Sequence, residues 1–335
     1  MKGFVDYLKD YFRNIPLKNF LFTLVFVAAL IALNYTLGIE SRIRALSPWP
    51  LSFAIFFGFY FCVFGIAYCL QSGLSLSAIR EKRSFGILLL LAPLFFSLKM
   101  IPWDLSFITG SRGSDPWNHY WLILLQLPVK LLVMIGLLYG CWQVEAICHQ
   151  AEGGNRFNGR NSLWGRNSLS DRDHFYGLTA RNFSVQPHFQ ILLLLSLVVA
   201  LASTQHDFLW TYPKVKNISF LDGYAHPAWP WKLLYEISYG LDFVSIELFF
   251  RGFLVLGFVR FAGIHAILPM AAFYCTIHFG KPPGECISSF FGGLALGVIA
   301  WRSRTILGGL IVHLGLAWMM EIGGWLGNSL IRGTH

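Results

Sequence analysis

Long apolar stretches alternate with short polar ones along the whole chain of 335 residues. Nine apolar runs are long enough for helices, and several approach the ~20 residues that a membrane-spanning helix needs. They cover approximately residues 19–37, 51–70, 84–102, 120–143, 188–204, 232–258, 263–280, 285–301 and 304–326. The pattern predicts an all-α protein, a polytopic transmembrane helical bundle of about eight or nine spans. The uncertainty of one span comes from the short, closely spaced runs near the C-terminal end.

Composition supports lipid as the main environment of the chain. Hydrophobic residues make up 55% and charged residues 13%, about half of the roughly 25% that soluble globular proteins carry. This balance excludes a soluble enzyme, a disordered chain and a secreted disulfide scaffold. Six cysteines lie in or beside apolar runs without any C-x-x-C pair, which indicates reduced apolar side chains. They are Cys62, Cys69, Cys141, Cys148, Cys275 and Cys286.

The net charge of +9 is interpreted here as a signal of orientation, because cytoplasmic loops collect Lys and Arg. With the N-terminus inside, fifteen basic residues fall on cytoplasmic segments and eight on the opposite side. We therefore expect an integral membrane protein with a cytoplasmic N-terminus, in a bacterial-type cell membrane. Membrane lipid is an expected partner, whereas nucleic acid is not.

A basic polar stretch divides the chain. Residues 149–187 are rich in Arg, Asn, Gly and Ser and are expected to form a cytoplasmic loop. Before it, residues 1–148 form a predicted N-terminal region of four spans. After it, residues 188–330 form a predicted C-terminal transmembrane core, which holds nearly all of the ionisable residues that fall inside apolar runs.

Those ionisable residues are the candidates for function, because a charged side chain at mid-membrane costs about 2.5–3.5 kcal/mol on insertion scales. Glu247 and Arg251 are four apart and share a helix face. His278 ends one apolar run, and His313 lies near the middle of another, with Glu321 two turns further along the same face. We expect them to converge on one polar pocket.

Such a set supports more than one chemistry. A carboxylate and a His can share a water and remove its proton as it attacks a carbonyl, while a second His donates to the developing oxyanion. Two His and a Glu are also a ligand set for zinc, with a fourth position open for water. The residues Glu247, His278 and His313 are compatible with both arrangements.

At these positions the chain resembles the CAAX protease and bacteriocin-processing (CPBP) family of intramembrane proteases. The family motifs are E-E-x-x-x-R, F-x-x-x-H and H-x-x-x-N or H-x-x-x-D. Glu247 and Arg251 match the second Glu and the Arg, His278 matches the second motif with Tyr274 in the Phe position, and His313 matches the third. The likeness covers about residues 245–325, a quarter of the chain, and Gly252 after the Arg is also typical.

The resemblance implies an intramembrane endopeptidase acting on a hydrophobic or lipidated peptide or protein. Glu247 and His278 would activate water, His313 would stabilise the oxyanion, and Arg251 would hold Glu247. Tyr274 and Glu321 are possible accessory residues. Ile246 and Ala317 depart from the family, which has Glu and Asn there. These two positions raise an alternative, a catalytically inactive relative that acts as a binding or scaffold partner.

Two further points stay open at the level of sequence. A transporter or channel would also use ionisable residues inside the membrane, but the clustering in one half and the lack of a long repeat disfavour it. Lys130 follows Pro128 inside the fourth apolar run. It either faces a polar cavity beside a kinked helix or extends toward the membrane surface.

Overall fold

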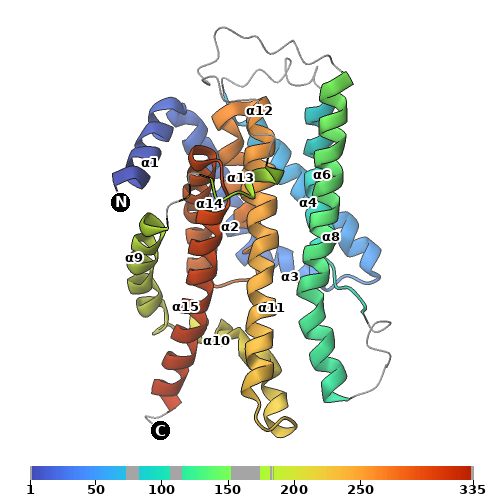
Figure 1. Cartoon of the computed structure of the whole chain (residues 1–335), viewed down its shortest axis with the longest axis vertical. Coiled ribbons are helices and arrows are strands. Elements are labelled where there is room, and N and C mark those ends of the chain that lie inside the picture. Colours follow the sequence, from blue (N-terminus) through green and yellow to red (C-terminus); the bar gives the residue numbers. More distant parts are fainter. Residues whose placement is uncertain are drawn as a thin grey trace.

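The computed structural model describes residues 2–72, 83–105, 115–151, 174–181, 183 and 185–332. Within these ranges the chain forms helices and short connections, with no strand. The N-terminal region contains α1 (Lys2–Asn14), α2 (Leu17–Leu37), α3 (Ile39–Arg44), α4 (Trp49–Cys69), α6 (Arg83–Met100) and α8 (Pro116–Ala151). Several long helices run along the long axis of the molecule, with α8 and α11 side by side (Figure 1).

The C-terminal region begins with the short helix η2 (Phe175–Gly177), followed by α9 (Gln186–Ala202), α10 (His206–Thr211) and η3 (Lys214–Gly223). The helix α11 (Trp229–Glu247) continues directly into η4 (Leu248–Gly257). The remaining elements are α12 (Phe258–Ala262), η5 (Gly263–Ala266), α13 (Ile267–Thr276), α14 (Pro283–Ser303) and α15 (Leu307–Arg332).

The predicted class, a helical membrane bundle, is confirmed. Each of the nine predicted apolar runs lies on helical segments. Among the described residues, six stretches are long and apolar enough to cross a membrane: Leu17–Leu37, Trp49–Cys69, Pro116–Val144, Trp229–Thr276, Pro283–Ser303 and Leu307–Leu330. Trp229–Thr276 contains two of the predicted runs, because α11 to α13 follow one another without a long break. The exact number of spans stays a prediction.

Local sequence explains where these helices begin and end. Gly38 adopts a left-handed φ of 62° and donates its backbone N–H to the Asn34 carbonyl, which closes α2. Pro50 lies in the first turn of α4 and Pro283 in that of α14, where the missing N–H costs no intrahelical hydrogen bond. Gly38 thus separates α2 from α3, and Pro283 marks where the 277–282 connection gives way to α14.

The main core is built from aromatic side chains of both halves of the chain. Phe96 of α6 packs against Phe249 and Phe250 of η4, with ring centroids 5.2 Å apart in each pair. Tyr60 of α4 packs against Phe273 of α13 at 4.9 Å. Edge-to-face and tilted aromatic pairs of this kind stabilise by about 0.5–1.5 kcal/mol beyond area burial. The described parts of the two predicted regions therefore share one hydrophobic core.

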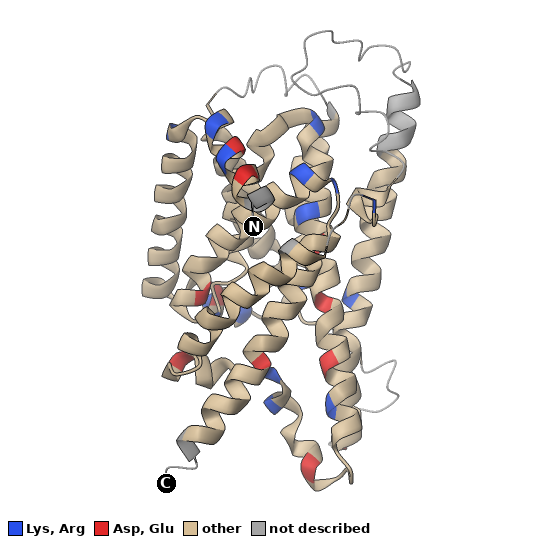
Figure 2. Cartoon of the chain, turned by 60° about the vertical axis from the view of Figure 1, so that its left-hand side comes forward, with Lys and Arg blue, Asp and Glu red and all other residues tan. Residues whose placement is uncertain are grey.

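The predicted division at residues 149–187 stays a prediction. Residues 152–173 of that basic loop lie outside the described ranges. Its described end, η2, packs against η4, where Tyr176 meets Phe253 with ring centroids 5.5 Å apart. Figure 2 shows how few charged residues lie among the helices, with red and blue positions inside the bundle as well as at its ends.

Candidate functional site

Glu247 is the last residue of α11, and Arg251 lies in the π-helical segment η4 that follows. π-Helical turns are rare and occur frequently at functional sites. The Arg251 Nη1 and the Glu247 Oε1 are 3.0 Å apart, and both side chains are fully buried, with 0% exposure. The pair predicted from the spacing of four residues is thus formed, and it removes two charges from contact with lipid and solvent.

Two glycines allow the π-helical segment to pack closely against η2. A Cβ built on Gly252 would lie 2.7 Å from the Tyr176 carbonyl oxygen, and one on Gly257 would lie 3.1 Å from the Tyr176 ring. The first distance is too short for any side chain. Gly252 stands out in the sequence for its place after Arg251. The close approach of the η2 backbone requires a glycine at this position.

His313 of α15 reaches the carboxylate of Glu247. The His313 Nδ1 lies 2.9 Å from the Glu247 Oε1, so His313 and Arg251 share one carboxylate oxygen. The other oxygen, Oε2, faces Gly309, where a Cβ would lie only 2.4 Å away. Gly309, one turn before His313, thus leaves the space that the carboxylate occupies.

Tyr274 of α13 joins the same cluster from its other side. Its hydroxyl oxygen lies 3.2 Å from the His313 Nε2. The Arg251 guanidinium lies over the Tyr274 ring, 4.3 Å from its centroid, in cation–π geometry. Phe243, one turn before Glu247, packs against the His313 ring at 4.6 Å. Two helical segments, α11 and α13, therefore contact the His313 ring and both of its nitrogens.

The contacts assign the tautomer of His313. An ionised carboxylate only accepts hydrogen bonds, so Nδ1 carries the proton that His313 donates to Glu247. In neutral imidazole, Nε2 is then an acceptor, and the Tyr274 hydroxyl donates to it. The result is a chain, from Tyr274 through His313 to Glu247, in which the basic nitrogen of His313 points away from the carboxylate.

His278 lies next to this chain rather than in it. Its Nδ1 is 3.1 Å from the Tyr274 carbonyl oxygen, and its ring packs edge-on against the Tyr274 ring at 4.7 Å. A carbonyl only accepts, so Nδ1 donates and Nε2 is left as an acceptor. Among the described residues, His278 makes neither a hydrogen bond nor an ion pair with Glu247 or His313.

The remaining candidates have other surroundings. Ile246 and Ala317, which stand where the family has Glu and Asn, are 6% and 4% exposed and lie in apolar packing. Glu321 accepts hydrogen bonds from the backbone N–H groups of Lys214 and Val215, at 2.7 and 3.1 Å. It therefore caps the start of η3, two turns of α15 away from His313.

In the part of the chain that is described, no three His, Cys, Asp or Glu side chains lie close enough together to hold a metal ion, and a zinc site stays a prediction. Glu247 and His313 are in contact, while His278 packs against the Tyr274 ring. Cys62, Cys69, Cys275 and Cys286 form no disulfide, while the side chain of Cys148 lies outside the described residues.

Sequence reasoning missed a second polar cluster on another face of α11. The Lys99 ammonium of α6 contacts both the Asp242 carboxylate and the Ser245 hydroxyl. Asp242 lies inside an apolar run only five residues before Glu247, which was the available signal. Phe243, the contact of His313, carried no signal because one aromatic residue among many in an apolar helix is not distinctive.

The fold and the buried cluster of Glu, Arg, Tyr and His define a helical membrane protein with a polar cluster inside its bundle. Residues 228–319 match the family model described as Type II CAAX prenyl endopeptidase Rce1-like. This match covers about a quarter of the chain and supports the membership of the CAAX protease (CPBP) family that the motifs predicted. Neither a curated protein nor a solved structure matches the chain.

Proposed function

We propose that the protein is an intramembrane endopeptidase of the CAAX-protease type, which hydrolyses a peptide bond in a hydrophobic or lipidated, membrane-associated peptide or protein. The observation that carries the proposal is the buried chain of Glu247, His313 and Tyr274. Its position inside a helical membrane bundle of this family is consistent with a substrate that arrives through the membrane.

In this proposal His313 is the general base. A water takes the place of the Tyr274 hydroxyl at the His313 Nε2, and gives its proton to that nitrogen as its oxygen attacks the peptide carbonyl. Glu247 stabilises the imidazolium that forms, and Arg251 holds the Glu247 carboxylate in place. The imidazolium then protonates the leaving amine, so the proton balance closes without another acid.

Tyr274 provides the second part of the mechanism. Once water occupies the Nε2 position, the phenol can turn its O–H to the oxyanion of the tetrahedral intermediate. This role would replace the donor that the family takes from the position of Ala317. His278 packs on the Tyr274 ring and positions it. The base is thus His313, and not the pair of Glu247 and His278 that the resemblance implies.

A second candidate is a non-catalytic binding or scaffold protein. The apolar packing of Ile246 and Ala317 favours it, since both family positions have lost their polar side chains. This candidate needs the same pocket but no reaction, so a direct test of turnover separates the two functions.

The test uses the purified protein in liposomes with a mixture of quenched fluorogenic peptides, whose hydrophobic C-terminal segments are presented with and without a farnesylated cysteine. Peptidase function predicts product peptides whose new carboxylate carries one ¹⁸O when the reaction is run in H₂¹⁸O. If no peptide is cleaved while several bind, the scaffold function is supported and the peptidase is rejected.

A further inference from the structure

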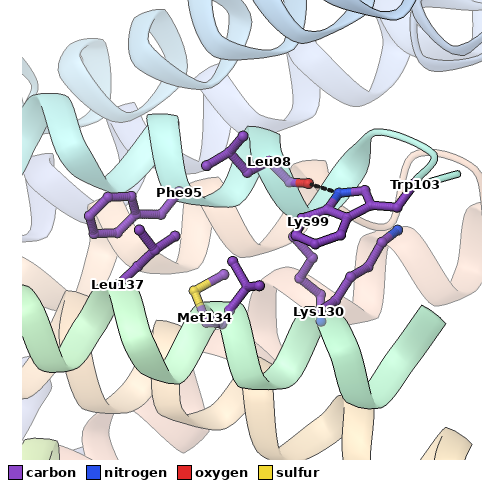
Figure 3. A pocket seen from close by; sticks show the side chains of 8 residues that line it. Phe95, Leu98, Lys99, Trp103, Lys130, Met134 and Leu137 are labelled. Carbon is purple, nitrogen blue, oxygen red and sulfur yellow. Dashed lines mark hydrogen bonds between the residues drawn. The ribbon is translucent and has the colours of Figure 1, made fainter. Parts of the chain in front are cut away.

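A small pocket between α6 and α8 lies beside the second polar cluster and shares Lys99 with it. It is lined by Phe95, Leu98, Lys99, Trp103, Lys130, Val133, Met134 and Leu137. The Lys130 side chain extends from α8 toward Trp103, while Lys99 extends from α6 toward α8 (Figure 3). The Trp103 indole N–H donates to the Leu98 carbonyl at 2.8 Å, which closes the end of α6 and fixes one wall.

The charges in this region do not balance. Lys99 is paired with Asp242, and the nearby Arg44 is paired with Glu40. Lys130 has no hydrogen bond and no ion pair within 4 Å among the residues that the structure describes. One positive charge is therefore left without a partner in a pocket whose other lining residues are mostly apolar.

The position of Lys130 excludes the second of its two interpretations. It lies fourteen residues from each end of the apolar stretch Pro116–Val144, which is roughly 20 Å along the helix in both directions. A four-carbon side chain cannot cover that distance to reach the membrane surface. Lys130 thus faces the pocket, where an unpaired ammonium is costly unless an anion joins it.

The pocket lies at nearly the same depth in the bundle as the reactive centre. Ser245, which Lys99 contacts, precedes Glu247 by two residues of the same helix, a rise of about 3 Å. The two sites lie on different faces of α11, whose diameter with side chains is about 10–12 Å. A peptide that passes beside α11 from one site to the other must span at least this distance, which takes about three or four extended residues or more. A lipid phosphate, by contrast, belongs to the membrane surface.

We propose that Lys130, together with Lys99, forms a binding site for a carboxylate of the peptide substrate, and that this site sets how far from that carboxylate the peptide is cleaved. The proposal rests on the peptidase function described above. The carboxylate is either the C-terminal group or an acidic side chain, and both present the same chemistry to the two ammonium groups. Asp242 competes with it for Lys99.

The experiment measures binding without cleavage, in the His313→Ala background and in nanodiscs of uncharged phosphatidylcholine. The probes are acetyl-Leu-Val-Leu with a free carboxylate, its C-terminal amide, and the amide of acetyl-Leu-Glu-Leu. We expect the free acid to bind at least tenfold more tightly than the first amide. If the Glu-containing amide binds as tightly as the acid, the source of the carboxylate is a side chain.

The variants locate the effect. Lys130→Met is expected to abolish the advantage of the acid, Lys130→Arg to keep it, and Asp242→Asn to increase it by freeing Lys99. Lys9→Met, an exposed lysine of α1, is the matched control and keeps it. Equal binding of acid and amide to the protein with Lys130 intact overturns the proposal, as does an acid advantage that persists in Lys130→Met.

Two outcomes distinguish this proposal from a lipid-binding site and from the peptidase function. If Lys130→Met weakens the association of the protein with nanodiscs that contain phosphatidylglycerol but leaves peptide binding unchanged, the site binds lipid. This result would overturn the proposal. A protein that cleaves none of the test peptides but still prefers the acid through Lys130 would reject the peptidase function and leave the carboxylate site in place.

Discussion

Two polar clusters lie on different faces of α11, and they differ in how their charges are balanced. Around Glu247 every charge has a partner, and the side chains of Glu247 and Arg251 have no exposed surface. Among the described residues the Lys130 ammonium has no partner, and the Asp242 carboxylate that pairs with Lys99 is 25% exposed. The first cluster is balanced in charge within the protein, whereas the second keeps an unpaired positive charge beside a small pocket.

This difference separates a reactive centre from a recognition site. A buried ion pair gains little over apolar packing of similar volume, but its disruption leaves a single buried charge at a cost of about 3–5 kcal/mol. The Glu247–Arg251 pair is therefore better explained by the positioning of His313 than by stability. An unpaired ammonium has no such structural reason, which is why Lys130 is proposed to bind a partner from outside the chain.

The largest effect is expected from breaking the balanced cluster. Glu247→Leu leaves Arg251 buried without its carboxylate, which should lower stability by about 3–5 kcal/mol and cleavage by about 10³-fold or more. The double variant Glu247→Leu with Arg251→Met should recover most of the melting temperature in detergent but none of the cleavage. A single variant as stable as the parent would show that the pair is not buried as described.

Tyr274→Phe tests whether the phenol takes part in the reaction. Removal of an oxyanion donor costs about 10²- to 10³-fold in kcat, and because the hydroxyl acts only in the transition state, KM should change little. Steady-state kinetics on one cleaved peptide measure both constants. The family has Phe at this position, so an unchanged kcat would assign the oxyanion to another donor and return Tyr274 to a packing role.

Gly309→Ala tests the space that the carboxylate needs. The added methyl group would lie 2.4 Å from the Glu247 Oε2 and must displace it. A misplacement of about 1 Å costs roughly 10²-fold in rate, while the apolar core is left intact. Gly136→Ala in α8 is the matched control, because a Cβ there meets no atom within 4 Å. Equal activity of the two variants would contradict the geometry at Glu247.

The smallest effect is expected in the unbalanced cluster. Lys130→Met removes a charge that has no partner, so the melting temperature of the peptide-free protein should stay the same or rise slightly. The same measurement on Glu247→Leu provides the contrast. A large loss of stability in Lys130→Met would mean that Lys130 is paired within the fold, and the distinction between the two clusters would fail.

The sequence predicted the helical membrane fold and the contact between Glu247 and Arg251 because both depend on local patterns. Apolar runs mark the helices, and the spacing of Glu247 and Arg251 places them together. Contacts between distant helices could not be predicted in the same way. The contact between Gly309 and Glu247 depends on how α15 packs against α11. The contact between Lys99 and Asp242 depends on how α6 packs against α11.

His278 illustrates the same limit. Its motif predicts that it belongs near Glu247, but its ring packs against Tyr274, which in turn contacts His313. Which of two histidines touches a carboxylate depends on side-chain directions, since α13 ends just before His278 and α15 continues past His313. Glu321 lies on the same helix face as His313, yet its carboxylate accepts a hydrogen bond from the backbone at the start of η3.

The most direct test of the central claim is the rate of peptide cleavage in liposomes by His313→Ala, compared with His206→Ala, an exposed histidine of α10. If His313 is the base held by Glu247, cleavage falls by about 10²- to 10⁴-fold in His313→Ala and stays at the parent rate in the control. Full cleavage by a folded His313→Ala variant would contradict the account.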